Sequence, residues 1–144
     1  MIPTLLIAWC LLAVTVTIHA AGLSALLRRV TAPAERSGRF WPVTKRLVQV
    51  AWALVLLHLA EIAVWALFYW WQRCLPDAES SFYFSGVTYT TVGYGDLVLP
   101  KEWRLLGAVE GLTGILMCGL STGFFFIVVS RMLTSPEHRT AVPR

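Results

Sequence analysis

The sequence predicts an all-α membrane protein with three transmembrane helices and a short re-entrant segment between the last two. Hydrophobic residues make up 57% of the 144 residues and charged residues only 14%, whereas soluble domains carry about 25% charged residues. Apolar stretches near residues 2–27, 47–71 and 103–130 are each long enough to cross a hydrocarbon core of roughly 30 Å. A lipid bilayer is therefore the expected environment of the chain.

Residues 1–27 form the first expected helix, an extra N-terminal transmembrane helix. A secretory signal peptide is the competing interpretation, and the Ala20-Ala21 pair would suit its cleavage. Against it, no Lys or Arg precedes the apolar run, and the run exceeds the roughly 7–15 apolar residues of such peptides. We therefore favour a retained helix, packed on the outside of the second one. It lacks the regularly spaced Arg residues of a voltage sensor, so intrinsic voltage sensing of that type is not expected.

The basic residues predict the orientation of the chain. A net charge of +4 would also suit a nucleic-acid-binding protein, but these residues stand beside the apolar stretches. Because cytoplasmic loops carry an excess of Lys and Arg, we expect residues 28–46 to be a cytoplasmic linker and the N-terminus to lie outside. Pro33, Gly38 and Pro42 argue against one continuous helix there, and a short interfacial stretch could open at Phe40. Residues 132–144 then form a short cytoplasmic tail, and no nucleic-acid partner is expected.

Residues 80–96 lie between the second and third spans and are too polar and glycine-rich for a further crossing. Ser80 and Ser81 would suit the capped start of a short helix, which breaks near Thr90. Non-helical backbone at membrane depth is tolerated only where protein buries it or where it lines a water-filled path. A re-entrant loop follows from these constraints.

The loop sequence Thr91-Val92-Gly93-Tyr94-Gly95 suits the dehydration of a cation. Successive backbone carbonyls replace the hydration shell of an ion if they all point one way. That geometry needs backbone conformations open mainly to glycine, which accounts for Gly93 and Gly95. The side chains of Val92 and Tyr94 would point away from the ions and pack against the scaffold. The short helix would direct its negative C-terminal end towards the ions.

The run Thr90 to Asp96 makes the chain resemble the pore-forming domain of tetrameric potassium channels, from about Lys45 to Arg131. Residues 110–114 and 120–123 resemble the inner helix of prokaryotic inward-rectifier-type channels, and the whole arrangement resembles small three-helix bacterial ion-channel proteins. A chance glycine-rich turn is the alternative, but its placement between two spans argues against it.

The resemblance implies a pore domain at residues 47–131 in a homotetramer, in a bacterial inner membrane. Residues 47–71 would be the outer helix, 80–96 the pore helix and filter, and 103–130 the inner helix. Permeant K⁺ would bind at Thr91, Val92, Gly93 and Tyr94. Asp96 would brace the filter from behind. Val87 stands where some members have a Glu that pairs with this aspartate, which leaves Tyr83 as its partner.

The last span carries five glycines, of which Gly114 matches the family's gating hinge. Close helix packing is the alternative role for these glycines. Ile115, Cys118, Thr122 and Phe126 follow helical spacing and share one face. The resemblance makes this face the lining of a cavity and Phe126 its inner constriction. Core or lipid contact is the simpler role for such a stripe.

Glu110, His19, His58 and Glu61 lie well inside the spans, where an ionisable residue is costly and suggests function. Glu110 is interpreted as a brace for the short helix or filter, with direct contact to passing ions as the alternative. His19, His58 and Glu61 are interpreted as a buried polar contact between the first two helices, with proton sensing as the alternative. Their sequence spacing does not indicate a metal site.

The sequence therefore predicts a potassium-selective channel subunit. No nucleophile–base pair, phosphate-binding loop or metal motif is visible, so we expect no enzymatic activity, no cofactor and no small-molecule substrate. A non-selective cation channel is one alternative, although related non-selective filters often lack the tyrosine found here at Tyr94. A non-conducting regulatory subunit is the other, although it would not need an intact filter. The three cysteines are expected to be packing residues, and only Cys74 would meet an oxidising compartment.

Overall fold

A computed structural model describes residues 2–31 and 40–133, and these residues form four helices and no strand. The helices are α1 (Ile2–Thr31), α2 (Phe40–Trp71), α3 (Ala78–Tyr89) and α4 (Arg104–Leu133). Three of them contain stretches long and apolar enough to cross a membrane: Pro3–Val30, Val43–Trp71 and Arg104–Met132. The chain is therefore an all-helical, multi-pass membrane protein. Residues 32–39 of the predicted basic linker and residues 134–144 of the predicted tail lie outside the described residues.

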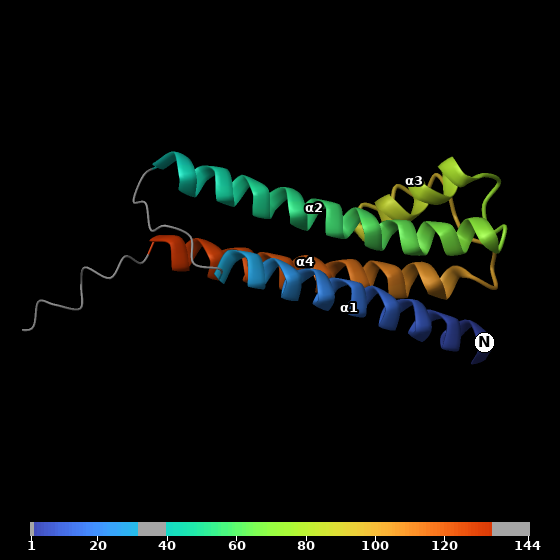
Figure 1. Ribbon diagram of the computed structural model, residues 1–144. Helices are drawn as coiled ribbons and strands as arrows, with labels where there is room; N and C mark the ends of the chain where they lie inside the picture. The colour runs from blue at the N-terminus through green and yellow to red at the C-terminus, as the bar shows by residue number, and fades with distance from the viewer. Residues whose placement is uncertain (1, 32–39, 134–144) are drawn as a thin grey trace, which may run out of the picture.

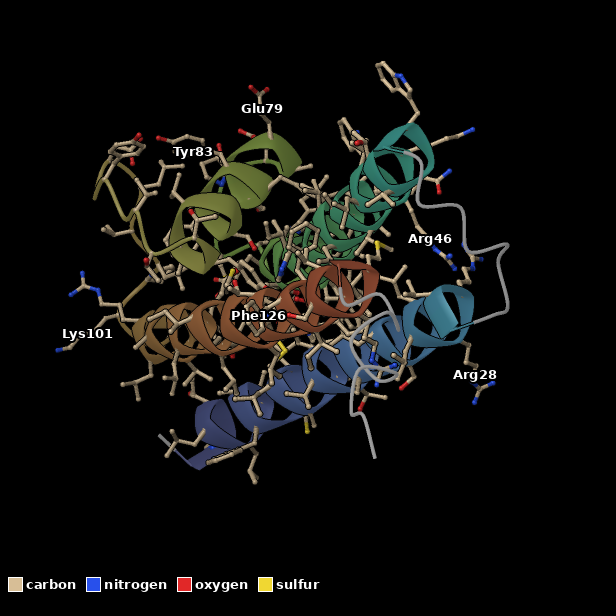
Figure 2. All side chains as sticks on the ribbon, turned by 90° about the vertical axis from the view of Figure 1, so that its left-hand side faces the viewer. Arg28, Arg46, Glu79, Tyr83, Lys101 and Phe126 are labelled. Atoms are coloured by element: carbon tan, nitrogen blue, oxygen red, sulfur yellow. The ribbon has the colours of Figure 1, made fainter. Side chains whose placement is uncertain are left out.

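The three long helices lie side by side, and the short helix α3 lies at one end of them (Figure 1). α1 and α4 run in the same direction and α2 runs against them. The N-terminus therefore lies at the end that carries α3. Arg28 and Arg46 lie at the opposite end, which faces the viewer in Figure 2.

Two helices begin earlier than the sequence predicts. α2 starts at Phe40, so the expected interfacial stretch and the second span are one continuous helix. Pro42 does not prevent this, because it lies in the first turn, where backbone N–H groups have no intrahelical acceptor. α3 starts at Ala78, and Asp77 rather than the serine pair caps it by accepting a hydrogen bond from the Ser80 N–H at 2.7 Å.

The end of α2 is a tight C-cap that turns the chain towards α3. Arg73 adopts a φ of 53°, the left-handed region usually occupied by glycine at this position. The Cys74 N–H donates to the Tyr69 carbonyl at 2.9 Å, and the Arg73 N–H donates to the Trp70 carbonyl at 3.0 Å. These two bonds satisfy carbonyls that the helix end leaves free, and the turn places α3 against α2.

α1 packs against α2, as expected, and also against α4. Polar groups explain the placement in part: the Trp65 indole N–H donates to the Thr15 hydroxyl at 3.1 Å. The Arg46 guanidinium donates to the carbonyls of Arg29 and Val30, each at 2.9 Å. A cation at a helix C-terminus is favourable because that end carries partial negative charge, so Arg46 fastens α2 to the end of α1.

The interior contains two apolar clusters with polar side chains between them. The cluster at the α3 end centres on Trp65, Tyr69, Phe84 and Leu106. The cluster at the other end centres on Val50, Leu54 and Val128. Between them lie buried polar residues from all four helices: Thr15, His19, Glu61, Ser85, Glu110 and Ser121. Buried polar groups in an apolar environment need partners, and these side chains make specific hydrogen bonds.

Candidate functional site

The loop that follows α3 has an alternating backbone. Thr91, Gly93 and Gly95 have φ values of 62°, 51° and 77°, whereas Val92 and Tyr94 keep negative φ. Alternation between left-handed and ordinary conformations lets successive peptide groups present the same atom to one side of the chain. The Gly93 N–H donates back to the Val87 carbonyl at 3.0 Å, so the start of the loop stays attached to α3.

The loop is uncovered in the single chain. All residues from Thr91 to Asp96 are exposed, and the Tyr94 side chain is 72% exposed. The packing expected for Val92 and Tyr94 is therefore not provided by their own chain. Their exposed apolar and aromatic surface is thus open to contact with lipid or with another molecule.

One side-chain hydrogen bond closes the loop onto α3. The Tyr83 hydroxyl donates to Oδ2 of Asp96 at 2.8 Å. This bond raises the pKa of the Tyr83 phenol, because the carboxylate stabilises the protonated hydroxyl. Val87, one turn along α3, offers no carboxyl group, so Tyr83 is the residue that the structure places against Asp96.

Glu110 connects three helices at the base of α3. Its carboxylate is fully buried and accepts a hydrogen bond from the Tyr69 hydroxyl of α2 at 2.8 Å. Its other oxygen lies 2.5 Å from the Ser85 hydroxyl of α3, which itself lies 2.9 Å from the Ile62 carbonyl. Tyr69 and Ser85 were not singled out from the sequence, because nothing in their spacing points to a partner on another helix.

Gly114 lies directly beneath the end of α3. A Cβ atom added there would overlap the carbonyl oxygen of Tyr89, the last residue of α3, and would lie 2.8 Å from its carbonyl carbon. The close approach of two backbones therefore requires glycine at this position. The residue expected to be a hinge is also a contact point between α3 and α4.

The four residues expected to line a cavity share an uncovered face of α4. Ile115, Cys118, Thr122 and Phe126 are all exposed in the single chain, and Phe126 is 70% exposed. Figure 2 shows Phe126 among the side chains of α4. The other helices of the chain cover Met117, Ser121 and Val128 on the opposite face, which leaves this face to lipid, water or another subunit.

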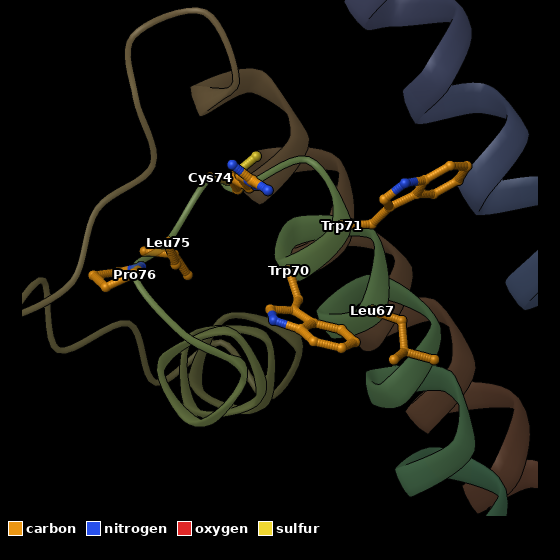
Figure 3. A pocket seen from close by; sticks show the side chains of 7 residues that line it. Leu67, Trp70, Trp71, Cys74, Leu75 and Pro76 are labelled. Atoms are coloured by element: carbon orange, nitrogen blue, oxygen red, sulfur yellow. The ribbon is translucent and has the colours of Figure 1, made fainter.

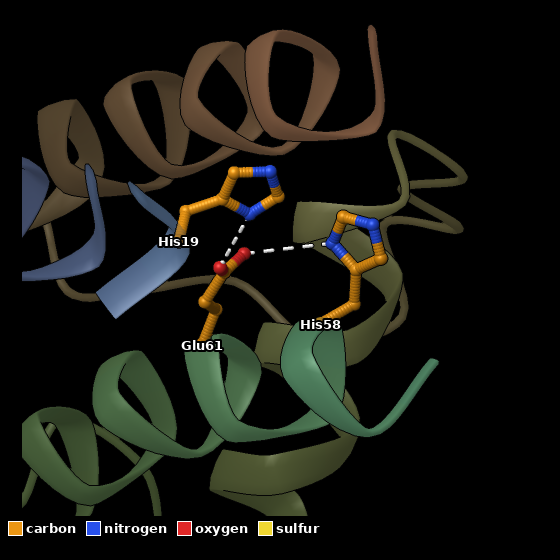
Figure 4. A group of neighbouring side chains, drawn as sticks. All are labelled: His19, His58 and Glu61. Atoms are coloured by element: carbon orange, nitrogen blue, oxygen red, sulfur yellow. Dashed lines mark hydrogen bonds and ion pairs between the residues drawn. The ribbon is translucent and has the colours of Figure 1, made fainter. Parts of the chain in front are cut away.

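His19, His58 and Glu61 meet in the middle of the bundle (Figure 4). Nδ1 of His19 lies 2.7 Å from one carboxylate oxygen of Glu61, and Nδ1 of His58 lies 3.5 Å from the other. The Tyr89 hydroxyl donates to Glu61 and lies 2.9 Å from Nδ1 of His58. The sequence indicated the two histidines and the glutamate but missed Tyr89, because an aromatic residue in a short apolar helix reads as packing.

A groove of about 940 Å³ lies where α2 ends (Figure 3). It is lined by Leu67, Trp70, Trp71, Arg73, Cys74, Leu75 and Pro76. No residue of the loop 91–96 lines it, so it is separate from the alternating backbone. Burial raises the pKa of the Cys74 thiol, which lowers its reactivity and fits the expected packing role.

Comparison with known families and proteins identifies one match. A family model described as an ion channel matches residues 44–131. This range contains most of α2, all of α3 and the alternating loop, and α4 nearly to its end. No curated protein and no solved structure matches the chain.

Proposed function

The chain belongs to the ion channel family, and from this premise we propose that it is one subunit of a potassium-selective channel. The ions would pass along residues 91–95, and Thr91, Val92, Gly93 and Tyr94 would supply the oxygens that bind them. The observation that carries the proposal is the positive φ at Thr91, Gly93 and Gly95 in an exposed loop between two spans.

The alternation supports a cation path for a chemical reason. A potassium ion that sheds its water needs several oxygens at once, and stacked rings of carbonyl groups supply them. Residues with alternating backbone conformations can direct successive carbonyls to one side. α3 ends at Tyr89 immediately before this loop, so the negative end of its dipole would favour cations there.

One chain supplies only part of such a ring, so we propose a homotetramer. The loop and the α4 face with Ile115, Cys118, Thr122 and Phe126 are exposed in the single chain. Four copies around one axis would bring the loops together and would turn this face towards the central cavity. Phe126 would then form its inner constriction. Asp96, Tyr83 and Glu110 would hold the loop from behind.

The basic residues support an orientation with the N-terminus outside and the C-terminus in the cytoplasm. Arg28, Arg29, Lys45 and Arg46 lie at the end of the bundle away from α3. Loops rich in Lys and Arg stay in the cytoplasm. The loop 91–95 would therefore open towards the outside, and the expected cell membrane is the bacterial inner membrane.

A non-selective cation channel is the second candidate, since it would use the same helices. Tyr94 favours potassium, because its ring would fill the space behind the loop and hold the carbonyl rings at one diameter. A subunit that does not conduct would need neither the two glycines nor the alternating backbone.

The decisive experiment is ion flux into liposomes that hold the purified tetramer, with potassium and sodium gradients compared and barium as blocker. We expect barium-sensitive potassium flux and little sodium flux. Gly93→Ala should abolish this flux, because alanine at a φ of 51° is strained. Gly86→Ala is the matched control: it lies in α3, and an added Cβ meets nothing within 4 Å.

Each alternative gives a distinct result in the same assay. Equal potassium and sodium fluxes in the wild type would contradict selectivity and favour the non-selective channel. Absence of flux from a verified tetramer, under every ionic condition tested, would contradict conduction. Equal flux through Gly93→Ala and Gly86→Ala would show that ions do not pass along the loop.

A further inference from the structure

Three side chains of the kind that bind transition metals converge at the junction of α1 and α2. His19 comes from α1, and His58 and Glu61 come from α2, one turn apart. One ligand atom of each lies within 4.8 Å of the others, and the two imidazole rings are 5.5 Å apart, centre to centre. The spacing along the chain gave no hint of this set, because it needs a residue from each of two helices.

The charge of the cluster calls for a cation. The Glu61 side chain is completely buried, in the middle of a stretch that can span a membrane. A carboxylate in such a place is costly unless it is paired. In the described part of the chain its charge partners are the two imidazoles, which are neutral when they act as metal ligands. A divalent ion between the three groups would pair with the carboxylate and would leave a net charge of +1 at the site.

The surroundings resemble those of metal ligands rather than those of an apolar contact. Metal-binding histidines usually hold their second ring nitrogen in a hydrogen bond, and Nε2 of His19 lies 3.4 Å from the Ser121 hydroxyl. The Tyr89 hydroxyl donates to Glu61 and lies 2.9 Å from Nδ1 of His58, so it adds a polar group beside two of the three side chains. The His58 side chain is 19% exposed and forms the open side of the cluster.

The donor set indicates which ion would bind. Two nitrogens and one carboxylate oxygen suit zinc, whereas calcium and magnesium prefer oxygen ligands throughout. Zinc bonds of about 2.0–2.2 Å in a tetrahedron place ligand atoms roughly 3.3–3.5 Å apart. The His58–Glu61 separation of 3.5 Å already fits, whereas the His19–Glu61 separation of 2.7 Å is to the other carboxylate oxygen. The ligand atoms of the three residues lie within 4.8 Å of one another, so the side chains must shift to hold one ion.

We propose that His19, His58 and Glu61 bind zinc, or a divalent ion with the same ligand preference, and that the bound ion reduces flux through the loop 91–95. The Glu61 carboxylate accepts a hydrogen bond from the Tyr89 hydroxyl. Metal binding would pull the carboxylate away from that hydroxyl. Tyr89 is the last residue of α3 and packs on Gly114 through its carbonyl group. The effect on flux rests on the proposed function, whereas zinc binding does not.

Zinc bound per chain, measured by elemental analysis after dialysis of the purified, tag-free protein, tests the site. We expect about one zinc per chain, and we expect His19→Gln and Glu61→Gln each to weaken binding more than about tenfold. His138→Gln, which replaces the remaining histidine of the chain, and Glu79→Gln on the exposed side of α3 are matched controls and should bind as the wild type does.

A second measurement uses the wild-type protein, so it tests the site even if the variants fail to assemble. Wild-type protein loaded with Co²⁺ should show the visible absorption of a four-coordinate nitrogen–oxygen site, and zinc should abolish it. Absence of saturable zinc binding to the wild type would refute the site and leave a hydrogen-bonded network alone. Undiminished binding in His19→Gln would refute it equally.

The liposome assay separates the site from the proposed function. Zinc should lower potassium flux severalfold in the wild type and leave that of His19→Gln unchanged. Zinc that binds without changing the flux would refute the control of conduction. A chain without any potassium flux would contradict the proposed channel, while the binding measurement would still decide the site.

Discussion

Gly114→Ala should be the most damaging of the conservative changes in α4. The added Cβ would overlap the Tyr89 carbonyl oxygen and would lie 2.8 and 3.2 Å from the carbonyl carbon and the Cα of that residue. All three atoms belong to the backbone of a helix end, which cannot rotate away as a side chain can. Overpacking of this kind costs about 1–3 kcal/mol, and we expect the upper part of that range.

Two neighbouring glycines provide a graded control. An added Cβ at Gly111 would lie 3.5 Å from the Thr88 carbonyl oxygen, and at Gly107 its nearest neighbour would be a Phe84 ring carbon at 3.6 Å. Both distances are ordinary contacts. These two alanine variants should therefore match the wild type or gain up to about 1 kcal/mol from helix propensity.

The assay compares the free energy of unfolding in mixed detergent and SDS with potassium flux in liposomes for all three variants. Gly114→Ala should lose both stability and flux, because α3 must shift at the base of the loop. Equal stability of Gly114→Ala and Gly111→Ala would refute the packing argument. Unchanged stability with altered opening would instead show that Gly114 acts as a hinge.

Three further changes test the other residues of the site. Tyr83→Phe removes the hydrogen bond to Asp96; potassium current should decline faster during recording while selectivity is retained, and a wild-type time course would contradict the brace. Glu110→Ala leaves the Tyr69 hydroxyl without its acceptor, whereas the Ser85 hydroxyl keeps the Ile62 carbonyl; the loss should cost about 1–3 kcal/mol in SDS unfolding, and Glu110→Gln should retain most of the stability. Phe126→Ala should raise the open probability of single channels, and an unchanged value would rule out a constriction there.

The sequence predicts the helices well because their causes are local. Long apolar stretches give the three spans, and the glycines of the loop give the positive φ values at Gly93 and Gly95. The predicted starts of α2 and α3 were less accurate. A proline in the first turn of a helix does not end it, and Asp77 is as good an N-cap residue as serine. The left-handed backbone conformation of Thr91 could not be predicted, because threonine does not favour that conformation.

The sequence predicted the buried contact of His19 with Glu61 between the first two helices. Most other contacts between helices could not be predicted, because they depend on how the helices rotate against one another. Glu61 and His58 are one turn apart on one helix, so the sequence predicted that they lie together. Tyr89 joins them only because α3 packs against α2, and Ser121 joins only because α1 reaches α4. The same packing brings α1 into contact with α4 as well as with α2.

The two buried carboxylates act on the same short helix. Glu110 of α4 contacts Ser85, and Glu61 of α2 contacts Tyr89. These positions are four residues apart, so they lie on one face of α3, one turn from each other. The face that carries them is therefore fastened to the other helices of its own chain, and Gly114 supports its last carbonyl. Beyond Tyr89 the loop is held to α3 by the bond from the Gly93 N–H to the Val87 carbonyl and by the bond between Tyr83 and Asp96. A loop that is firmly fixed at its base and exposed along its walls supports the proposed homotetramer, in which neighbouring copies would cover those walls.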